Sequence, residues 1–303
     1  MDAMSGPVTE GANVKDLYAV GEIPPAYHVP KTMWAWAIRK ERHGRPKDAM
    51  QLEVVPTPDI GEDEVLLLVM AGGVNYNGVW AALGEPVSVL DMHSQPYHVA
   101  GSDAAGVVWA VGSKVKRWKP GDEVVVHCNQ DDGDDDECNG GDPMFSPSQR
   151  IWGYETPDGA FAQFARVQAR QLMPRPKHLT WEECACYTLT LATAYRMLFG
   201  HKPHELKPGQ NVLVWGASGG LGVYAIQLIN TAGANAIGVI SDESKRDYVM
   251  SMGAKGVLNR KDFDCWGQLP KVNGEGFDAY MKETRKFGKA IWQFTGGKEV
   301  DIV

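Results

Sequence analysis

The stretch NVLVWGASGGLG, residues 211–222, joins a short apolar run to a glycine-rich turn, and GVYAIQLINTAG (222–233) then has a helical pattern. The apolar run indicates a buried strand. Glycines in such a turn allow a tight bend and close approach of a dinucleotide pyrophosphate, while the helix N-terminus offers unpaired N–H groups. The alternative is a purely structural turn, but the strand before and the helix after it favour cofactor binding. The candidate cofactor-binding residues are Gly216, Ala217, Ser218, Gly219, Gly220, Leu221 and Gly222.

The residues after this turn continue to alternate between strand and helix patterns. AIGVIS (236–241) and GVLN (256–259) indicate buried strands, and the segments 244–253 and 278–297 indicate helices. This order predicts an α/β domain, with a doubly wound parallel sheet covered on both faces. Residues 300–303 have the pattern of the opening of one more buried strand. We therefore expect the sheet to be incomplete and the chain to be C-terminally truncated.

The upstream part of the chain has a different pattern. Short apolar or alternating runs joined by Gly/Pro turns occupy residues 33–40, 52–58, 63–75, 105–112 and 119–127. They predict a β-rich domain, a distorted barrel or sandwich. Thr180 and Glu183 form a capping-box pattern that predicts a helix to about Phe199. We expect a helical or irregular leader at 1–30, the β-rich catalytic domain at 31–185 and the nucleotide-binding domain at 186–303.

Composition limits the classes of partner. The 303-residue chain carries 30 Lys and Arg against 38 Asp and Glu, a formal net charge of −8, and 44% hydrophobic residues. This balance disfavours nucleic acid and anionic membrane as general partners. The N-terminus has no signal-peptide pattern, and no apolar run is long enough to span a membrane. Five cysteines form no dense framework, so we expect reduced thiols and a cytoplasmic protein.

The end of the strand 236–241 bears on the choice of cofactor. An acidic residue there normally binds the 2′-hydroxyl of NAD. Ser241, Lys245 and Arg246 offer hydrogen bonds and positive charge to the 2′-phosphate of NADPH, whereas Asp242 leaves NAD open. Lys245 and Arg246 are alternatively solvated helix residues. The balance favours NADPH.

Four motifs, VNYN (74–77), AGSDAAGVV (100–108), KPGDEVVV (119–126) and GASGGLG (216–222), resemble the medium-chain dehydrogenase/reductase superfamily. The resemblance implies a GroES-like catalytic domain followed by a Rossmann-type nucleotide domain. Zinc-containing members carry Cys near the first motif and Gly-His-Glu at the second, where this chain has residues 75–77 and 101–103 without Cys or His. A catalytic zinc needs three such ligands. We therefore predict no metal and disfavour a zinc alcohol dehydrogenase.

Further stretches narrow this resemblance to the crotonyl-CoA carboxylase/reductase family. They are NYNGVW (75–80), GEPVS (84–88), PYHV (96–99), RIWGYET (150–156) and PKHLTWEE (176–183). The resemblance implies NADPH-dependent reduction of a short enoyl-CoA such as crotonyl-CoA, with CO2 captured by the resulting enolate. It also implies a homotetramer.

The same resemblance implies a group of catalytic residues. Asn77 matches an asparagine that contacts CO2, Glu155 matches a glutamate of that pocket, and Tyr154 stands where a backbone N–H is the expected contribution. A fourth member, a histidine, is expected beyond Val303. Holding CO2 requires donors aimed at its oxygens in a small pocket that excludes water. Asn77 is alternatively a turn cap, and Glu155 a structural acid.

Two other functions stay open from the sequence. One is a plain enoyl-thioester or quinone reductase that protonates the enolate, and the other is an inactive, truncated nucleotide-binding fragment. The acidic run at 131–137 is interpreted as a solvated surface excursion, because it lacks the ligand spacing of a known cation loop. Cys128 and Cys138 do not supply four ligands, so no structural metal is expected there.

Overall fold

The computed structural model describes residues 4–5, 14–200 and 205–303. The chain divides into two compact units, which we call unit 1 (Met1–Leu189) and unit 2 (Thr190–Val303). Across the described residues, no helix combines the length and the apolar character required to cross a bilayer.

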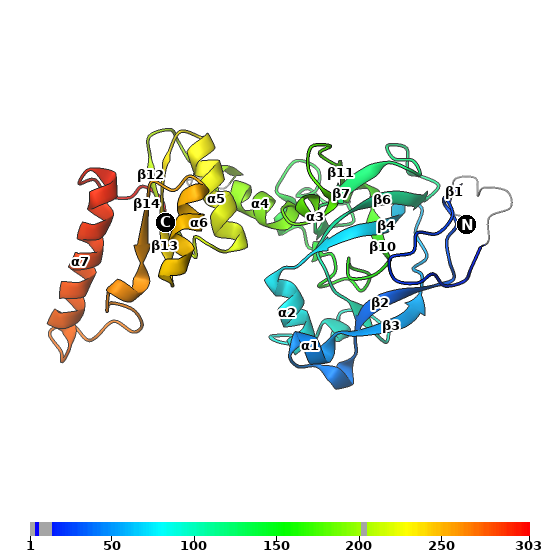
Figure 1. Cartoon of the computed structure of the whole chain (residues 1–303), viewed down its shortest axis with the longest axis horizontal. Helices are drawn as coiled ribbons and strands as arrows, with labels where there is room; N and C mark the ends of the chain where they lie inside the picture. The colour runs from blue at the N-terminus through cyan, green and yellow to red at the C-terminus, as the bar shows by residue number, and fades with distance from the viewer. Residues whose placement is uncertain (1–3, 6–13, 201–204) are drawn as a thin grey trace. The chain divides into compact units, whose positions relative to one another are not determined.

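A six-stranded antiparallel sheet forms the body of unit 1 (Figure 1). Its path runs β10–β4–β6–β7–β11, with β1 beside β6. The strands are β1 Met4–Ser5, β4 Glu64–Gly73, β6 Asp103–Val111, β7 Glu123–Val126, β10 Phe164–Gln168 and β11 Leu172–Pro174. The register between β4 and β6 shifts at two places, and irregularities of this kind add bend and twist to a sheet. The β-rich domain predicted from the sequence is confirmed.

Two smaller sheets complete unit 1. The first has the order β3–β2–β5, and the second pairs β8 with β9. Their bounds are β2 Thr32–Ile38, β3 Gln51–Pro56, β5 His98–Val99, β8 Asn129–Gln130 and β9 Arg150–Ile151. The short helices of the unit are α1 Pro46–Ala49, α2 Tyr76–Leu83 and α3 Trp181–Cys184, with 3-10 turns at Lys40–Arg42, Val89–Asp91, Pro143–Phe145 and Ala169–Gln171.

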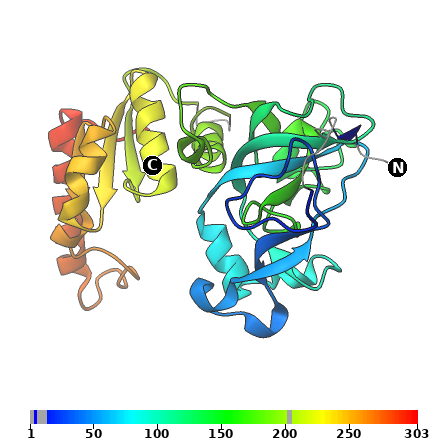
Figure 2. The ribbon, with the colours of Figure 1, turned by 45° about the vertical axis from the view of Figure 1, so that its right-hand side comes forward.

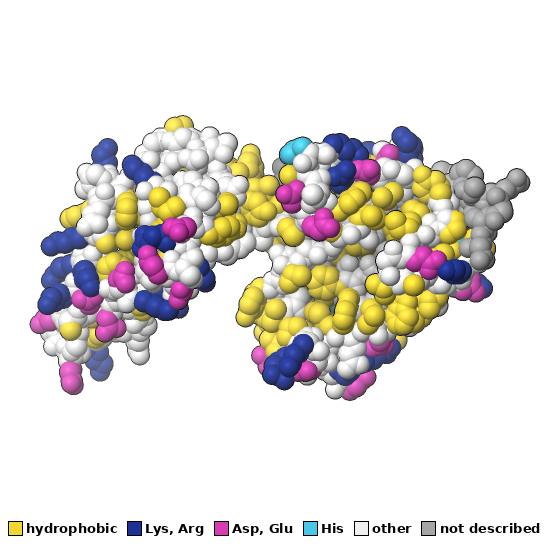
Figure 3. Space-filling model, in the orientation of Figure 1, with side chains coloured by type: hydrophobic (Ala, Val, Ile, Leu, Met, Phe, Trp, Pro, Cys, Tyr) yellow, Lys and Arg dark blue, Asp and Glu magenta, His cyan; other side chains and the backbone are white. Residues whose placement is uncertain are grey.

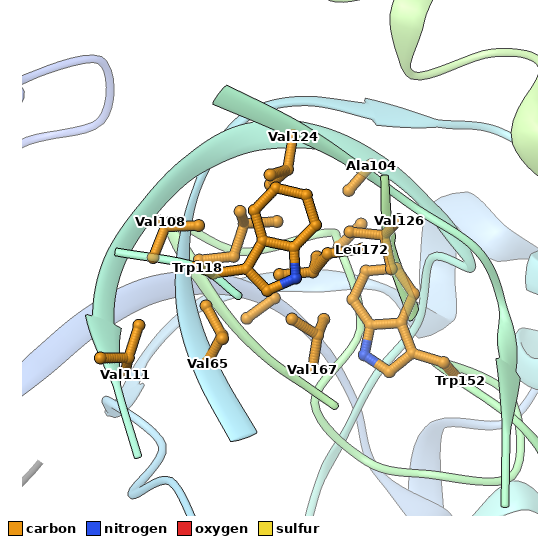
Figure 4. Packing of buried hydrophobic residues seen from close by; sticks show 13 residues of the cluster. Val65, Ala104, Val108, Val111, Trp118, Val124, Val126, Trp152, Val167 and Leu172 are labelled. Carbon is orange, nitrogen blue, oxygen red and sulfur yellow. The ribbon is translucent and has the colours of Figure 1, made fainter. Parts of the chain in front are cut away.

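Apolar side chains of the curved sheet form the main core of unit 1 (Figure 4). The indole rings of Trp118 and Trp152 lie among branched side chains of the surrounding strands, including Val65, Val108, Val124, Val126, Val167 and Leu172. Trp152 is fully buried, and its Nε1–H lies 3.0 Å from the carbonyl oxygens of both Asp158 and Arg166. Burying an indole while satisfying its donor is strongly stabilising. Trp152 therefore anchors the loop that follows β9.

The N-terminal leader is irregular where it is described. Residues 14–31 contain turns and bends but no helix, so the helical alternative is wrong for this segment. It is held by tertiary hydrogen bonds instead, because Thr32 N donates to Asp16 O at 3.0 Å and Trp109 Nε1 donates to His28 O at 2.8 Å. The part of the predicted leader at 1–3 and 6–13 lies outside the described residues.

The helix predicted from Thr180 to about Phe199 is broken. Its capping box is confirmed, since Thr180 Oγ1 accepts from Glu183 N at 3.2 Å and Glu183 Oε2 accepts from Thr180 N at 2.8 Å. However, α3 ends at Cys184, and a second helix, α4 (Thr188–Tyr195), leads into a π-helical turn at Arg196–Gly200. The buried Asp103 carboxylate accepts from the Leu189 N–H at 2.8 Å and from the Thr188 hydroxyl, so it caps a new helix start. The continuous helix was wrong because this acceptor comes from a distant strand.

Unit 2 is a parallel sheet with helices on both faces, as predicted. Its strands run in the order β12–β13–β14, with bounds β12 Asn211–Trp215, β13 Asn235–Ile240 and β14 Gly256–Asn259. Helix α5 (Gly220–Thr231) and helix α6 (Arg246–Ser251) bury side chains against one face, and α7 (Phe277–Thr295) against the other. Figures 1 and 2 show α5 and α7 on opposite sides of the strands. Two 3-10 turns lie at Glu243–Lys245 and Arg260–Asp262.

The last residues of the chain extend this sheet. Ile302 forms a parallel bridge with Val212, on the side of β12 away from β13. Leu213 N donates to Ile302 O at 2.9 Å, and Asp301 N donates to Asn211 O at 2.8 Å. The strand pattern predicted at 300–303 therefore pairs as expected.

Candidate active site

The glycine turn, residues 216–222, connects β12 to α5. Gly216 has a φ of 61°, and the Gly219 N–H donates to the Gly216 carbonyl at 2.9 Å. A Cβ added to Gly222 would overlap the Gly216 carbonyl and lie 2.7 Å from the Ala217 Cα. Glycine is therefore required at positions 216 and 222 by the turn itself.

The middle of the glycine turn is open to a ligand. Gly219, Gly220 and Leu221 are exposed, and they begin α5, whose first N–H groups lack intrahelical acceptors. A buried hydroxyl lies beside them. Thr190 is 9% exposed, its Oγ1 has no hydrogen-bond partner in the described structure, and this atom lies 3.9 Å from the Cβ position of Gly220. Exposed helix amides and an unsatisfied hydroxyl fit a pyrophosphate.

The end of β13 carries the residues that bear on the choice between NAD and NADPH. Lys245 Nζ donates to Ser241 Oγ at 3.4 Å, so these two predicted residues come together. Arg246 faces other partners, because its guanidinium binds the Glu243 carboxylate and donates to Val257 O at 2.7 Å. Of the three predicted residues, Ser241 and Lys245 therefore lie together at the end of β13, whereas Arg246 is bonded to Glu243 and Val257.

Asp242 is the residue that left NAD open from the sequence. Its carboxylate accepts from the Ser244 hydroxyl at 2.8 Å, from the Ser244 N–H at 3.2 Å and from Lys261 Nζ at 3.2 Å. These bonds, that of the Ser244 hydroxyl first, lower the pKa of the Asp242 carboxyl to about 2. Lys261 compensates the negative charge that would oppose a 2′-phosphate. Lys261 was not predicted from the sequence, although it follows strand 256–259, whose carboxyl end lies at the same edge of the sheet as the end of β13.

The start of α2 and the start of β6 are joined by two side-chain amides. Asn77 Nδ2 donates to Ser102 Oγ at 2.7 Å, and Asn75 Nδ2 donates to Asp103 Oδ2 at 2.8 Å. Asn75, not Asn77, occupies the N-cap position of α2. Asn77 Oδ1 accepts from the Gly78 N–H at 3.0 Å. Both the oxygen and the nitrogen of the Asn77 amide are therefore hydrogen-bonded. The NH2 group has two N–H bonds, and only one of them is used by Ser102.

Asp103 is a fully buried carboxyl that accepts from three donors in two segments of the chain. Besides Asn75 it accepts from Leu189 N and the Thr188 hydroxyl. Burial raises the pKa of the Asp103 carboxyl to about 6, against the opposing effect of these hydrogen bonds. Its hydrogen bonds join the start of α2 and the start of α4 to β6.

Glu155 and Tyr154 lie in a tight turn after β9. Glu155 Oε2 accepts from Ile151 N at 2.6 Å, and the N–H groups of Tyr154 and Glu155 donate to Ile151 O at 3.1 and 2.8 Å. The backbone N–H expected from Tyr154 is therefore already bonded in this conformation. Burial raises the pKa of the Tyr154 phenol, so it is neutral.

This turn packs against the start of β6 and against α2. A Cβ on Gly153 would lie 2.7 Å from the Gly101 carbonyl carbon. The Tyr154 ring packs in a cluster that contains Ala81 and Ala82 of α2. Within the described residues no hydrogen bond or ion pair joins Asn77 to Glu155. Each candidate is oriented by its own local partner.

A buried histidine supports the same turn. His98 Nε2 lies 3.2 Å from Gly153 O, and His98 Nδ1 lies 3.1 Å from His93 Nε2. Burial, the largest cause, lowers the pKa of the His98 imidazole to about 3. Neutral His98 therefore donates to the Gly153 carbonyl from Nε2 and accepts from His93 at Nδ1.

The acidic run and the cysteine that follows it bring three possible cation ligands close together. Asp132, Asp135 and Cys138 offer ligand atoms within 4.8 Å of one another. Asp135 is already bonded to the Ser146 hydroxyl and to Cys138. Acidic groups of this kind are common on protein surfaces without a bound ion.

The chain is similar to known proteins over both of its units. Residues 61–177 match the family model of the alcohol dehydrogenase GroES-like domain. Over its whole length the chain is 76% identical to crotonyl-CoA carboxylase/reductase of Cereibacter sphaeroides and covers 71% of that protein.

Solved structures agree with the sequence relatives. A crotonyl-CoA carboxylase/reductase structure matches 95% of this chain with 74% identity and a TM-score of 0.91, and 68% of that chain is covered. The crotonyl-CoA carboxylase/reductase AntE, solved in complex with NADP, matches with 45% identity and a TM-score of 0.88, over 95% of this chain and 73% of AntE. The chain thus spans about 70% of the length of these relatives.

Proposed function

Because this chain belongs to the crotonyl-CoA carboxylase/reductase family, we propose that it catalyses the NADPH-dependent reductive carboxylation of a short enoyl-CoA such as crotonyl-CoA. The 76% identity over the whole chain is the observation that carries the proposal. The substrates are the enoyl-CoA and CO2, and the product from crotonyl-CoA is ethylmalonyl-CoA. The solved AntE complex with NADP supports the same cofactor for this chain.

The glycine turn and the edge of β13 are proposed to hold the cofactor. The open amides of Gly220 and Leu221 face the pyrophosphate, and Ser241 with Lys245 face the 2′-phosphate. Lys261 keeps Asp242 from opposing that phosphate. When bound, NADPH supplies a hydride.

The chain's own residues then decide the fate of the reduced substrate. Hydride addition to the β-carbon of the enoyl thioester leaves an enolate. Its α-carbon forms a carbon–carbon bond with CO2, or it accepts a proton to give the saturated thioester. We propose that the free N–H of Asn77 donates to a CO2 oxygen and that Glu155 positions a water or a neighbouring donor. The apolar surroundings of Tyr154 exclude bulk water.

The experiment that tests this function is a product analysis. Purified chain is incubated with NADPH, crotonyl-CoA, bicarbonate and carbonic anhydrase, and the acyl-CoA products are identified by mass spectrometry. We expect ethylmalonyl-CoA with CO2 and butyryl-CoA without it. Butyryl-CoA under both conditions would show a plain reductase. No consumption of NADPH under either condition would show that a chain of this length only binds nucleotide.

We further propose a cytoplasmic homotetramer. Five free cysteines suit a reducing compartment. The outer face of the β2–β3 pair supports self-association, because the cross-strand pairs Trp34–Val54 and Trp36–Leu52 place apolar side chains there. Trp36 is 49% exposed and Val54 is 44% exposed. Figure 3 shows apolar side chains gathered over this part of unit 1. Light scattering on the purified chain measures the assembly.

A further inference from the structure

The orientation of the Asn77 amide is set by two neighbours of opposite kind. The Gly78 N–H, which also donates to Asn75 O at 3.1 Å, lies 3.0 Å from Oδ1 and donates to it. Ser102 Oγ, 2.7 Å away, accepts from Nδ2. Rotating the amide by 180° would place its NH2 group against the Gly78 N–H, two donors facing each other. The backbone donor therefore selects the orientation, and the hydroxyl of Ser102 holds it.

This orientation matters because the oxygens of CO2 carry partial negative charge. An amide N–H attracts them, whereas an amide oxygen repels them. In the orientation held by Ser102, one N–H of Asn77 is used and one is left for a ligand. Without that acceptor the side chain is free to move among rotamers, and the donor is aimed at the ligand only part of the time.

Ser102 itself is held in place. It is 1% exposed and lies between two constrained residues. Gly101 has a φ of 106°, and an added Cβ would come 2.8 Å from Phe161 Cδ1. Asp103 is fully buried and is bonded to three donors. The hydroxyl of Ser102 is therefore a fixed acceptor rather than a mobile one.

From this arrangement we propose that Ser102 is a positioning residue for carboxylation, which fixes the Asn77 amide so that its second N–H is presented to CO2. The proposal rests on the proposed function. Ser102 acts through Asn77 and does not contact the substrates.

Kinetics test the proposal through the Ser102→Ala variant. Loss of one hydrogen bond is worth about 1 kcal/mol, so the apparent KM for CO2 should rise about five-fold and the share of butyryl-CoA should increase. The rate of NADPH oxidation with crotonyl-CoA in the absence of CO2 should stay within about two-fold of the parent. Ser146→Ala is the matched control, because it also removes a buried hydroxyl of unit 1 but lies in the 131–148 loop. An unchanged KM for CO2 in Ser102→Ala would overturn the proposal.

A double-mutant cycle identifies the residue through which Ser102 acts. In an Asn77→Ala background, Ser102→Ala should have almost no further effect on the share of carboxylated product. Equal effects of Ser102→Ala in both backgrounds would show that Ser102 does not work through Asn77.

A spectroscopic measurement decides the proposal even if the chain forms no carboxylated product. The side-chain amide signals of Asn77 in 15N-labelled protein are assigned by their loss in Asn77→Ala. In the parent they should be shifted and slow to exchange with water, and in Ser102→Ala they should approach those of exposed asparagines. Identical Asn77 signals in the two proteins would refute the positioning role. Absence of ethylmalonyl-CoA from the parent would refute the proposed function alone.

Discussion

The glycine turn and the Asn77 neighbourhood differ in how the chain builds them. The glycine turn is one stretch of seven residues that runs from the end of β12 into the first turn of α5, and its shape follows from contacts among its own atoms. The Asn77 neighbourhood combines the start of α2, the start of β6, and the turn after β9. A local site is therefore sensitive to its own backbone, whereas an assembled site is sensitive to the partners that hold it. Four predictions test this difference.

The largest effect is expected inside the glycine turn. Gly222→Val would force side-chain atoms onto the Gly216 carbonyl and Ala217, so the turn must open. We expect NADPH affinity, measured by fluorescence titration, to fall at least roughly a hundred-fold. Gly288→Ala in α7 is the matched control, because nothing lies within 4 Å of its Cβ position, and it should leave affinity unchanged. Near-normal NADPH binding by Gly222→Val would show that this turn does not hold the cofactor.

The next largest effect is expected for the pH dependence of stability, through the buried His98, which is bonded to the turn after β9. Its pKa of about 3 lies below the usual value of 6.5, so between these values the unfolded chain binds a proton that the folded chain does not. Stability is therefore lost as the pH falls from about 6.5 towards 3. His98→Gln should remove this dependence, which is worth about 3 kcal/mol between pH 7 and pH 4.

Amide hydrogen exchange in β6, followed in parallel at pH 7 and pH 4, measures the stability of unit 1. The constant cost of replacing a buried side chain cancels, because the two pH values are compared within each protein. Asp103 has a raised pKa, so its contribution to stability increases as the pH falls, opposite to that of His98. Because Asp103 is present in both proteins, its contribution does not affect the comparison. The exposed His178 supplies the control His178→Gln. Equal pH dependence in the parent and His98→Gln would contradict a neutral, buried His98.

A moderate effect is expected for cofactor choice. Lys261→Met leaves the Asp242 carboxylate without its cation beside Ser241 and Lys245. The dissociation constant for NADPH should rise about ten-fold while that for NADH changes little, because only NADPH carries the 2′-phosphate. Lys255→Met, an exposed lysine that precedes β14, removes the same charge as a control. Equal loss of NADPH and NADH affinity would indicate general damage to the site.

The smallest effect is expected for Thr190. Thr190→Val replaces the unsatisfied buried hydroxyl by a methyl group of similar shape. NADPH affinity should fall about five-fold, the value of one hydrogen bond, while thermal stability stays equal or rises. Thr231→Val at the far end of α5 is the control. Unchanged NADPH affinity in Thr190→Val would show that this hydroxyl does not reach the cofactor.

The sequence predictions succeeded for features set by neighbouring residues and failed where distant segments meet. Strands β2, β3, β4, β6, β7, β12, β13 and β14 and the capping box at Thr180 were predictable, since each depends on neighbouring residues. Strands β10 and β11 and the two-residue strands of unit 1 were not predicted. The continuous helix to Phe199 failed, because Asp103, far away in the sequence, starts a new helix at Thr188. The ambiguity at Asp242 was visible in the sequence, but the cation bound to it, Lys261, comes from after the next strand.

The amino-acid sequence by itself determined the order of the two folds, the glycine turn and the absence of Cys and His at the places where zinc-containing relatives bind metal. Those features depend on backbone propensity and on residue type at short spacing. Only the tertiary structure decided that Ser102 holds Asn77, that Lys261 binds Asp242, and that the hydroxyl of Thr190 is left without a partner beside the turn. Hydrogen bonds between distant segments depend on distances of a few tenths of an ångström, which arise only when the strands and helices pack.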